Sequence, residues 1–118
     1  MYDGGMAVDL FAGISVKEYA AALDWYEQLL GAPPAFSPND TEAVWELAEH
    51  RWLYIELRPE HAGHALQTIF VADFDERVAQ ISGRGLEPRT REVYENGVRK
   101  WTYVDPDGNE IGFGGNPR

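Results

Sequence analysis

The sequence predicts an α+β fold in which the order strand, helix, three strands occurs twice along the chain. The first helix is expected over about residues 17–30, where apolar side chains recur every three or four positions and Gly31 ends the pattern. A second helix is expected over residues 73–84, and each helix has one alternating segment before it and three after it. The two halves share little sequence identity, so the repeat is one of architecture.

A strand–turn–strand segment at residues 101–113 is the clearest element of this pattern. Residues 101–104 are aromatic and β-branched, which favours a half-buried strand. Pro106 presets the first corner of the turn, and Gly108 can take the positive φ that a tight turn needs. Taken alone, the turn predicts an ordinary hairpin.

Both halves divide into short elements separated by turn residues. In the first half, strands are expected over residues 8–16, 34–37, 42–48 and 51–57. In the second half, strands are expected over residues 66–71, 86–94, 101–104 and 110–113. We therefore expect one domain, 1–118, with module one at about 8–58, module two at about 64–114, and a loose leader at 1–7.

Composition and charge narrow the classes of function. The 118 residues are 44% apolar, enough for one modest core, and there is no cysteine for a disulfide or a thiol nucleophile. A formal net charge of −10 argues against nucleic-acid binding, which needs clustered Lys and Arg. The same charge permits a preference for cationic ligands, or serves solubility alone. With no membrane-length apolar run and no signal segment, we expect a cytoplasmic protein without a membrane partner.

Three short motifs stand in the same order as in a known protein family. Trp25-Tyr26 followed by Leu29-Leu30-Gly31 lies at the end of the first expected helix, and residues 71–75, Val-Ala-Asp-Phe-Asp, open the second. Residues 105–109 read Asp-Pro-Asp-Gly-Asn. With these motifs the chain resembles the vicinal oxygen chelate superfamily, which includes glyoxalases, bleomycin-resistance proteins and extradiol dioxygenases. The resemblance implies two βαβββ modules, curved mixed sheets around a cavity, and a homodimer. It leaves the chemistry open, because one fold hosts many functions.

The resemblance also implies where a metal would bind in metal-dependent relatives. Counted from the motifs, the four ligand positions fall on Phe11, Glu56, Leu66 and Gly112. Only Glu56 carries a ligating side chain, and one carboxylate cannot hold a divalent cation against water. We therefore expect no metal and no other cofactor. A lone carboxylate at such a position should have a raised pKa, a cationic partner or access to water.

One alternative keeps a metal site. Asp9, His64 and Glu110 each lie two residues upstream of a lost ligand position, on the same strand face, and would join Glu56 if three strands shifted together. Such a shift spans about 6–7 Å in each strand. Otherwise all three histidines of the chain are expected in surface loops.

On each strand, one face carries the apolar residues that pack on a helix, and the opposite face is expected to line the cavity. In the segment 51–57, positions 53, 55 and 57 are aliphatic and suit a helix, so the even-numbered side chains face the other way. An apolar wall with a few convergent polar groups is typical of a small-molecule site, and the alternative is that the rings simply fill the core. The expected ligand-binding residues are Phe11, Trp45, Trp52, Tyr54, Glu56, Leu66, Thr68 and Trp101, with Tyr103 as an alternative to Trp101.

Two classes of function remain open. The first is a non-catalytic protein that binds a small, planar or cationic organic molecule in the aromatic cavity. It would resemble the bleomycin-resistance proteins, which sequester a drug in a groove shared by two subunits. The second is a lyase, isomerase or dioxygenase of the same superfamily, either metal-dependent or using Glu56 as a general base. Three observations favour the first class. Three of the four metal-ligand positions are lost, the chain is acidic, and the expected cavity is aromatic.

Overall fold

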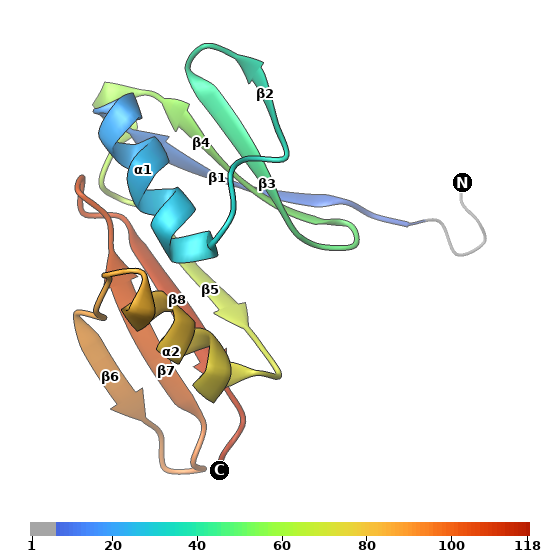
Figure 1. The fold of residues 1–118 in the computed structure, drawn as a ribbon, viewed down its shortest axis with the longest axis vertical. Helices are drawn as coiled ribbons and strands as arrows, with labels where there is room; N and C mark the ends of the chain where they lie inside the picture. Colours follow the sequence, from blue (N-terminus) through green and yellow to red (C-terminus); the bar gives the residue numbers. More distant parts are fainter. Residues whose placement is uncertain (1–6) are drawn as a thin grey trace.

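The computed structural model describes residues 7–118, which form two four-stranded sheets with one helix against each (Figure 1). Both helices cover the same side of the sheets and contact each other, so the molecule has a helical layer and a sheet layer (Figure 1). Of the leader expected at residues 1–7, all but Ala7 lies outside the described residues.

The elements alternate as the sequence predicts, and the α+β fold with eight strands and two helices is confirmed for the described residues. Module one comprises β1 (Leu10–Val16), α1 (Tyr19–Leu30), β2 (Phe36–Asn39), β3 (Glu42–Ala48) and β4 (Arg51–Leu57). After a 3-10 turn at Pro59–His61, module two comprises β5 (Leu66–Phe70), α2 (Phe74–Gly83), β6 (Thr90–Val93), β7 (Arg99–Val104) and β8 (Glu110–Gly115). Neither helix in this part of the chain has the length and apolarity to cross a lipid bilayer.

The two sheets have the same topology. Strand order is β1-β4-β3-β2 in module one and β5-β8-β7-β6 in module two. The first strand of each module pairs in parallel with the last, and the remaining pairs are antiparallel. β1 and β5 are therefore edge strands of their sheets.

One boundary differs clearly from the expected one, for a local reason. The segment expected as a strand over residues 86–94 forms only the four-residue β6. Leu86 still donates its N–H to the carbonyl of Ile81, so the chain there is closing α2. Pro88 has no N–H to donate to a neighbouring strand, so β6 begins only at Thr90.

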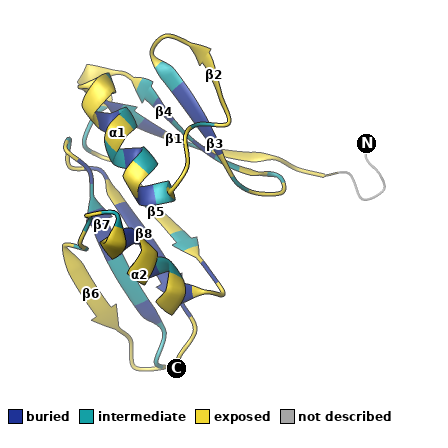
Figure 2. Cartoon of the chain, viewed as in Figure 1, coloured by how far each residue is buried: buried dark blue, intermediate teal, exposed yellow. Residues whose placement is uncertain are grey.

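The hydrophobic core lies between the helices and the sheets. α1 contributes Tyr26 and Leu29, and α2 contributes Phe74, Val78 and Ile81. The outer strands β2 and β6 are exposed along their length, whereas β8 is almost wholly buried (Figure 2). Most of the apolar strand residues expected to pack on the helices do so, and the most deeply buried include Ile14, Val16, Leu53, Ile55, Ile111 and Phe113. Leu57, expected on the same side, is 37% exposed at the end of β4, so its expected burial against the helix is wrong.

The turn at residues 105–109 ties the two modules together. One carboxylate oxygen of Asp105 accepts the N–H groups of Asp107 and Asn109 at 2.8 and 2.9 Å, which fixes the turn. The other oxygen accepts the hydroxyl of Tyr26, in α1, at 2.9 Å. Burial, and then the charge of Asp105, raise the pKa of Tyr26, so its hydroxyl remains a donor. Two of the three sequence motifs are therefore in direct contact.

Asn109 is the buried centre of this junction between the modules. Its side chain is fully buried. Its amide oxygen accepts the N–H groups of Gly63 and Ala65, in the linker, at 3.1 and 2.9 Å. Its amide nitrogen donates to the carbonyl of Ser15 in β1 at 3.0 Å and to the carboxylate of Asp105 at 2.8 Å. One side chain thus joins the linker, the first strand and the turn.

A cation from module two holds the C-terminal end of α1. The guanidinium of Arg84 donates to the carbonyls of Gln28 and Leu29 at 2.5 and 3.0 Å. These carbonyls are among the four at a helix end that have no partner within the helix, and a positive charge suits that end of the helix dipole. Gly31 follows with φ 78°, the left-handed conformation that commonly closes a helix.

Large apolar side chains are exposed on the side of the sheets that faces away from the helices. Leu66 is 69% exposed, Phe70 is 57% exposed and Phe11 is 47% exposed. Exposure of this kind is typical of a surface that another molecule covers.

Candidate functional site

Strand register decides which side chains share the sheet surface of module one that faces away from α1, called here the open face of module one. Residues directly opposite each other on paired strands point to the same side of a sheet. On β4, buried aliphatic residues alternate with half-buried ones that occupy the open face. The open face consists of Trp52, Tyr54 and Glu56 of β4, Phe11, Gly13 and Ser15 of β1, Glu42, Val44 and Glu46 of β3, and Phe36 of β2.

Three rings on this face form an aromatic platform, defined as Phe11, Phe36 and Trp52. The rings of Phe11 and Trp52 lie nearly parallel, with centroids 5.4 Å apart and an interplanar angle of 5°. Phe36 meets Trp52 edge-on, with centroids 6.1 Å apart and an angle of 70°. Both arrangements are ones that aromatic pairs prefer. Phe11 and Phe36 are each 47% exposed, so the platform is open to a further ring.

The ring of Tyr54 lies against Gly13, next to the platform. A Cβ atom at position 13 would come within 2.6 Å of the Cζ and Oη atoms of Tyr54, closer than any side chain tolerates. Gly13 therefore provides the space in which Tyr54 crosses β1. The aromatic surface continues in this way from Trp52 toward Glu56.

The three glutamates of the open face have no basic partner among the paired residues of β1 to β4. Glu42, Glu46 and Glu56 share the face, and register places no Lys, Arg or His there. Glu56 stands directly opposite Glu42, where two negative charges repel each other. Glu56 is half-buried, and within residues 7–118 it forms no ion pair. Its partial exposure gives this carboxylate contact with solvent, which is one of the arrangements expected for it.

Trp45 is not on the open face, so its expected place in the cavity wall is wrong. The side chain is 3% exposed and packs beneath α1, with its ring centroid 6.2 Å from that of Tyr26. Its indole N–H donates to the carbonyl of Ala32 at 2.9 Å. Burial is favourable here because the polar end of the ring has a partner.

Trp101 and its alternative Tyr103 also face the helix of their module, which corrects the expected placement of Trp101. The ring of Trp101 meets Phe74 of α2 edge-on, with centroids 5.4 Å apart. Tyr103 is almost fully buried, and this burial raises its pKa to about 12. The polar neighbours Lys100 and Thr102 occupy the opposite side of β7.

Leu66 and Thr68 lie on the open face of module two, defined as the side of the second sheet that faces away from α2. They stand opposite Glu110 and Gly112 of β8. A Cβ atom at Gly112 would come within 2.8 Å of the Lys100 side chain, so this glycine lets the lysine lie across the sheet. The structure thus places the expected ligand-binding residues on two separate sheets of one chain.

The four metal positions implied by the resemblance do not meet within one chain. Phe11 pairs with Trp52, whereas Glu56 pairs with Ser15, so Phe11 and Glu56 are about 13 Å apart along the sheet. The other two positions belong to module two. Within residues 7–118, His, Asp and Glu side chains form no group of three or more that could hold a metal ion.

The shifted set of metal ligands is not assembled in the chain either. Asp9 is engaged elsewhere, with the imidazole Nδ1 of His50 at 3.0 Å and the indole N–H of Trp52 at 3.2 Å. His64 is exposed ahead of β5, as expected for a surface histidine, and Glu110 lies in β8. His50 is half-buried, so the expectation of a simple surface histidine is incomplete there.

A cavity of about 660 Å³ between the two modules has no counterpart in the sequence analysis. It is bounded by the edge strands β1 and β5, the end of α1 and the start of α2. An ion pair between Arg77 and Asp73, 3.2 Å long, is part of its wall. The cavity depends on how the modules sit against each other, which no local sequence pattern encodes. Its apolar lining includes Leu10, Leu30, Leu53, Ile69, Val71 and Phe113, and Trp52 also borders it.

The expected ligand-binding residues omit several that lie on the open face, among them Phe36, Glu42 and Glu46. Phe36 belongs to a short segment with weak alternation, which gives little signal for a face. Glu46 had a usable signal, because it alternates with Trp45 in a strand whose other odd-numbered residues are apolar. The period therefore assigns the glutamate, and not the tryptophan, to the open face.

The fold and the motifs agree with a comparison against known families. Residues 8–113 match the family described as Glyoxalase/Bleomycin resistance protein/Dioxygenase superfamily. The chain belongs to this superfamily. The two sheets, curved and unclosed within one chain, are thus the βαβββ modules of a superfamily member.

Solved structures of the superfamily superpose on the chain. The glyoxalase/bleomycin resistance protein from Catenulispora acidiphila DSM 44928 is 57% identical, with a TM-score of 0.91, over 94% of this chain and 100% of that one. A bleomycin-binding protein complexed with bleomycin is 19% identical, with a TM-score of 0.74, over 93% and 99%. TnmS3, an antibiotic binding protein from Streptomyces sp. CB03234, is 20% identical, with a TM-score of 0.71, over 97% and 99%. The last two share the fold alone. A comparison with curated proteins gave no match.

Proposed function

We propose that this superfamily member binds a small, planar organic cation on the open face of module one, without a metal. The observation that carries the proposal is the half-exposed aromatic platform of Phe11, Phe36 and Trp52. Glu46 stands directly opposite Trp52, and Glu42 and Glu56 lie farther along the same face. A planar ring placed on this platform extends the stack of rings. A positive charge on that ring is attracted both to the aromatic faces and to the carboxylates.

Rings and carboxylates can recognise such a ligand without a metal. Phe11, Leu66 and Gly112 stand where the resemblance implies metal ligands, and none of them can ligate through its side chain. Glu56 and Glu42 face each other at one end of the open face, and Glu46 stands beside Trp52. A bound cation would relieve the repulsion within this group of negative charges.

We infer that a homodimer completes the site. The open faces of both modules expose apolar side chains, including Phe11 in module one and Leu66 and Phe70 in module two. Module two of one copy placed over module one of another would bury both surfaces and enclose a ligand between them. In that arrangement the partner subunit's Leu66 and the partner subunit's Thr68 form the wall opposite the platform.

Two structural neighbours show that this fold can hold a small organic molecule. One is a bleomycin-binding protein complexed with bleomycin, and the other is named an antibiotic binding protein. Both use this fold to hold a small organic molecule. An aromatic platform without metal ligands suits the same use here.

A matched pair of planar probes tests the preference for a cation. N-methylacridinium and acridine differ by one methyl group and one positive charge at mildly alkaline pH. We expect the protein to bind N-methylacridinium about tenfold more tightly than acridine, equivalent to ~1.4 kcal/mol. The measurement is a fluorescence titration with and without a metal chelator, and the chelator is expected to change neither affinity. Equal affinities for the two probes, or binding that disappears with the chelator, would contradict the proposal.

Glu56→Gln separates a ligand role for this carboxylate from a structural one. We expect the affinity for N-methylacridinium to fall by no more than about threefold, because Glu56 lies about 13 Å along the sheet from the Phe11–Trp52 pair and screening weakens its attraction. The affinity for acridine should stay unchanged, because only a charge is lost. The free energy of unfolding should stay unchanged or rise slightly, since repulsion with Glu42 is relieved. Glu95→Gln in the exposed turn after β6 is the matched control and should change neither quantity. A loss of about 1–3 kcal/mol of stability in Glu56→Gln would instead reveal a stranded partner.

The inferred dimer is tested by sedimentation velocity at micromolar protein concentration. We expect the wild-type protein to sediment mainly as a dimer. Leu66→Glu should shift it toward monomer, because it places a charge in an apolar contact. A wild-type protein that sediments only as a monomer would count against the shared site.

A further inference from the structure

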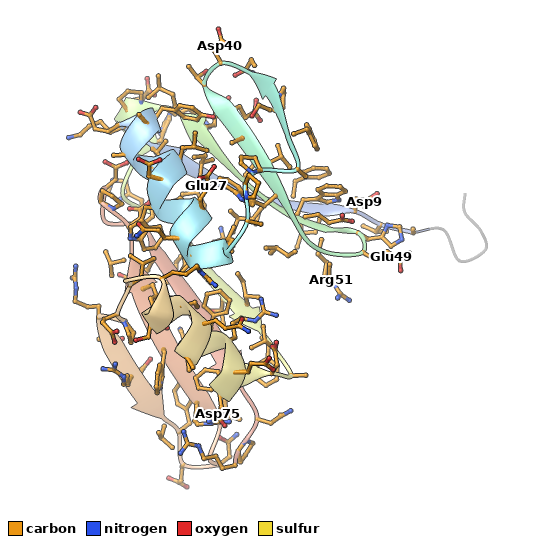
Figure 3. The ribbon with its side chains drawn as sticks, viewed as in Figure 1. Asp9, Glu27, Asp40, Glu49, Arg51 and Asp75 are labelled. Carbon is orange, nitrogen blue, oxygen red and sulfur yellow. The ribbon has the colours of Figure 1, made fainter. Side chains whose placement is uncertain are left out.

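Asp9 stands immediately before β1 and contacts the next strand and its hairpin. Its Oδ1 atom accepts the indole N–H of Trp52 at 3.2 Å, and the same oxygen lies 3.0 Å from Nδ1 of His50. Figure 3 shows Asp9 beside the β3–β4 hairpin, near the labelled Glu49 and Arg51. These contacts connect the start of the first strand to the central ring of the aromatic platform.

We propose that Asp9 is a positioning residue for the platform, and that its carboxylate fixes the indole of Trp52 parallel to Phe11. Asp9 precedes Phe11 by two residues, the spacing that brings side chains to the same side of an extended chain. This segment therefore supplies both the ring against which Trp52 stacks, 5.4 Å away, and the acceptor for its N–H. Because an indole has a single N–H, one acceptor is enough to stop the ring from turning.

His50 holds the carboxylate of Asp9 in place. Among residues 7–118, His50 is the only one other than glycine with a positive φ, 65°, a conformation that costs an ordinary side chain free energy. The backbone carbonyl of His50 accepts the N–H of Leu10 at 2.9 Å. His50 therefore contacts the start of β1 through both its backbone and its side chain. The Oε2 atom of Glu49 lies 3.8 Å from the far nitrogen of the same imidazole.

The contacts of Asp9 orient the indole ring of Trp52 and add little to the stability of the fold. The side chains of Asp9 and His50 are 48% and 43% exposed, and ion pairs that exposed add little stability. Hydrogen bonds from His50, and then from Trp52, lower the pKa of Asp9, so the carboxylate remains an acceptor at neutral pH. The inference rests on the proposed function, since a fixed indole matters for binding only if the platform holds a ligand.

The test compares Asp9→Ala with Asp9→Asn and uses Asp40→Ala, in the exposed turn after β2, as the matched control. The first readout is the indole N–H resonance of Trp52 in the unliganded protein, assigned by its loss in Trp52→Phe. The second is the affinity for N-methylacridinium, and the third is the melting temperature.

In Asp9→Ala we expect the Trp52 resonance to shift and to exchange faster with solvent, and the affinity to fall about fivefold. In Asp9→Asn most of the affinity should return, because the amide oxygen still accepts the indole N–H. The melting temperature should stay close to that of the wild type in all three variants.

An unchanged Trp52 resonance in Asp9→Ala would overturn the inference, and so would a shifted resonance with unchanged affinity. A wild-type protein that fails to bind N-methylacridinium would overturn the proposed function instead. The resonance would then still decide whether Asp9 fixes Trp52, because it is read without a ligand.

Discussion

Asn109→Ala is expected to lower the free energy of unfolding by about 3–5 kcal/mol. The substitution leaves the partly buried N–H groups of Gly63 and Ala65 without the acceptor that the fully buried Asn109 supplies. It also removes the donor to the carbonyl of Ser15, which holds β1 against module two. Each buried group left unpaired costs about 1–3 kcal/mol, so the loss should exceed that of one ordinary hydrogen bond.

Urea unfolding at a fixed protein concentration measures this loss, because a dimer makes stability depend on concentration. Asn96→Ala is the matched control. Asn96 also lies in a turn, but it is exposed, and within residues 7–118 its side chain accepts the N–H of Val98 alone, at 3.0 Å. We expect Asn96→Ala to cost less than about 1 kcal/mol. Equal losses in the two variants would show that Asn109 is an ordinary turn residue.

Trp52→Ala is expected to weaken the binding of N-methylacridinium by about 30-fold, equivalent to ~2 kcal/mol. The substitution removes the ring that both Phe11 and Phe36 contact, so neither remaining ring keeps its neighbour. Trp52→Phe keeps an aromatic face and should lose less affinity. The measurement is the same fluorescence titration that compares the two probes.

Trp101→Ala is the control for Trp52→Ala, because Trp101 belongs to the sequence-derived site but packs on Phe74 beneath α2. We expect it to lower stability by about 2–3 kcal/mol while leaving the probe affinity unchanged. The opposite pattern, with binding lost in Trp101→Ala and kept in Trp52→Ala, would contradict the assignment of faces.

The order of elements and the helix-facing sides of the strands could be predicted from periodicity. In β4, Leu53 and Ile55 are buried and alternate with the half-buried Trp52 and Tyr54, as a period of two requires. Trp45 shows where the prediction failed. Its aromatic character suggested the cavity, although its position in the alternation placed it with the core, and the carbonyl of Ala32 satisfies its N–H there.

The register of the parallel strands β1 and β4 could not be predicted from the sequence. A parallel pairing has no turn to set its register, so only the structure reveals that Phe11 stands beside Trp52 and Ser15 beside Glu56. The role of Asn109 was hidden for a similar reason. Its turn was recognisable from residues 105–109, but three of its four partners lie 44, 46 and 94 residues away. Such contacts depend on how the modules meet.

The crystal structure of the protein in complex with N-methylacridinium tests the proposed binding site most directly. We expect the planar ring to stack on the aromatic platform of Phe11, Phe36 and Trp52, with its charged nitrogen on the side of the carboxylates. We also expect module two of a second copy to cover it. A probe found instead in the cavity between the modules of one chain, among Leu53, Ile69 and Val71, would contradict the proposed site.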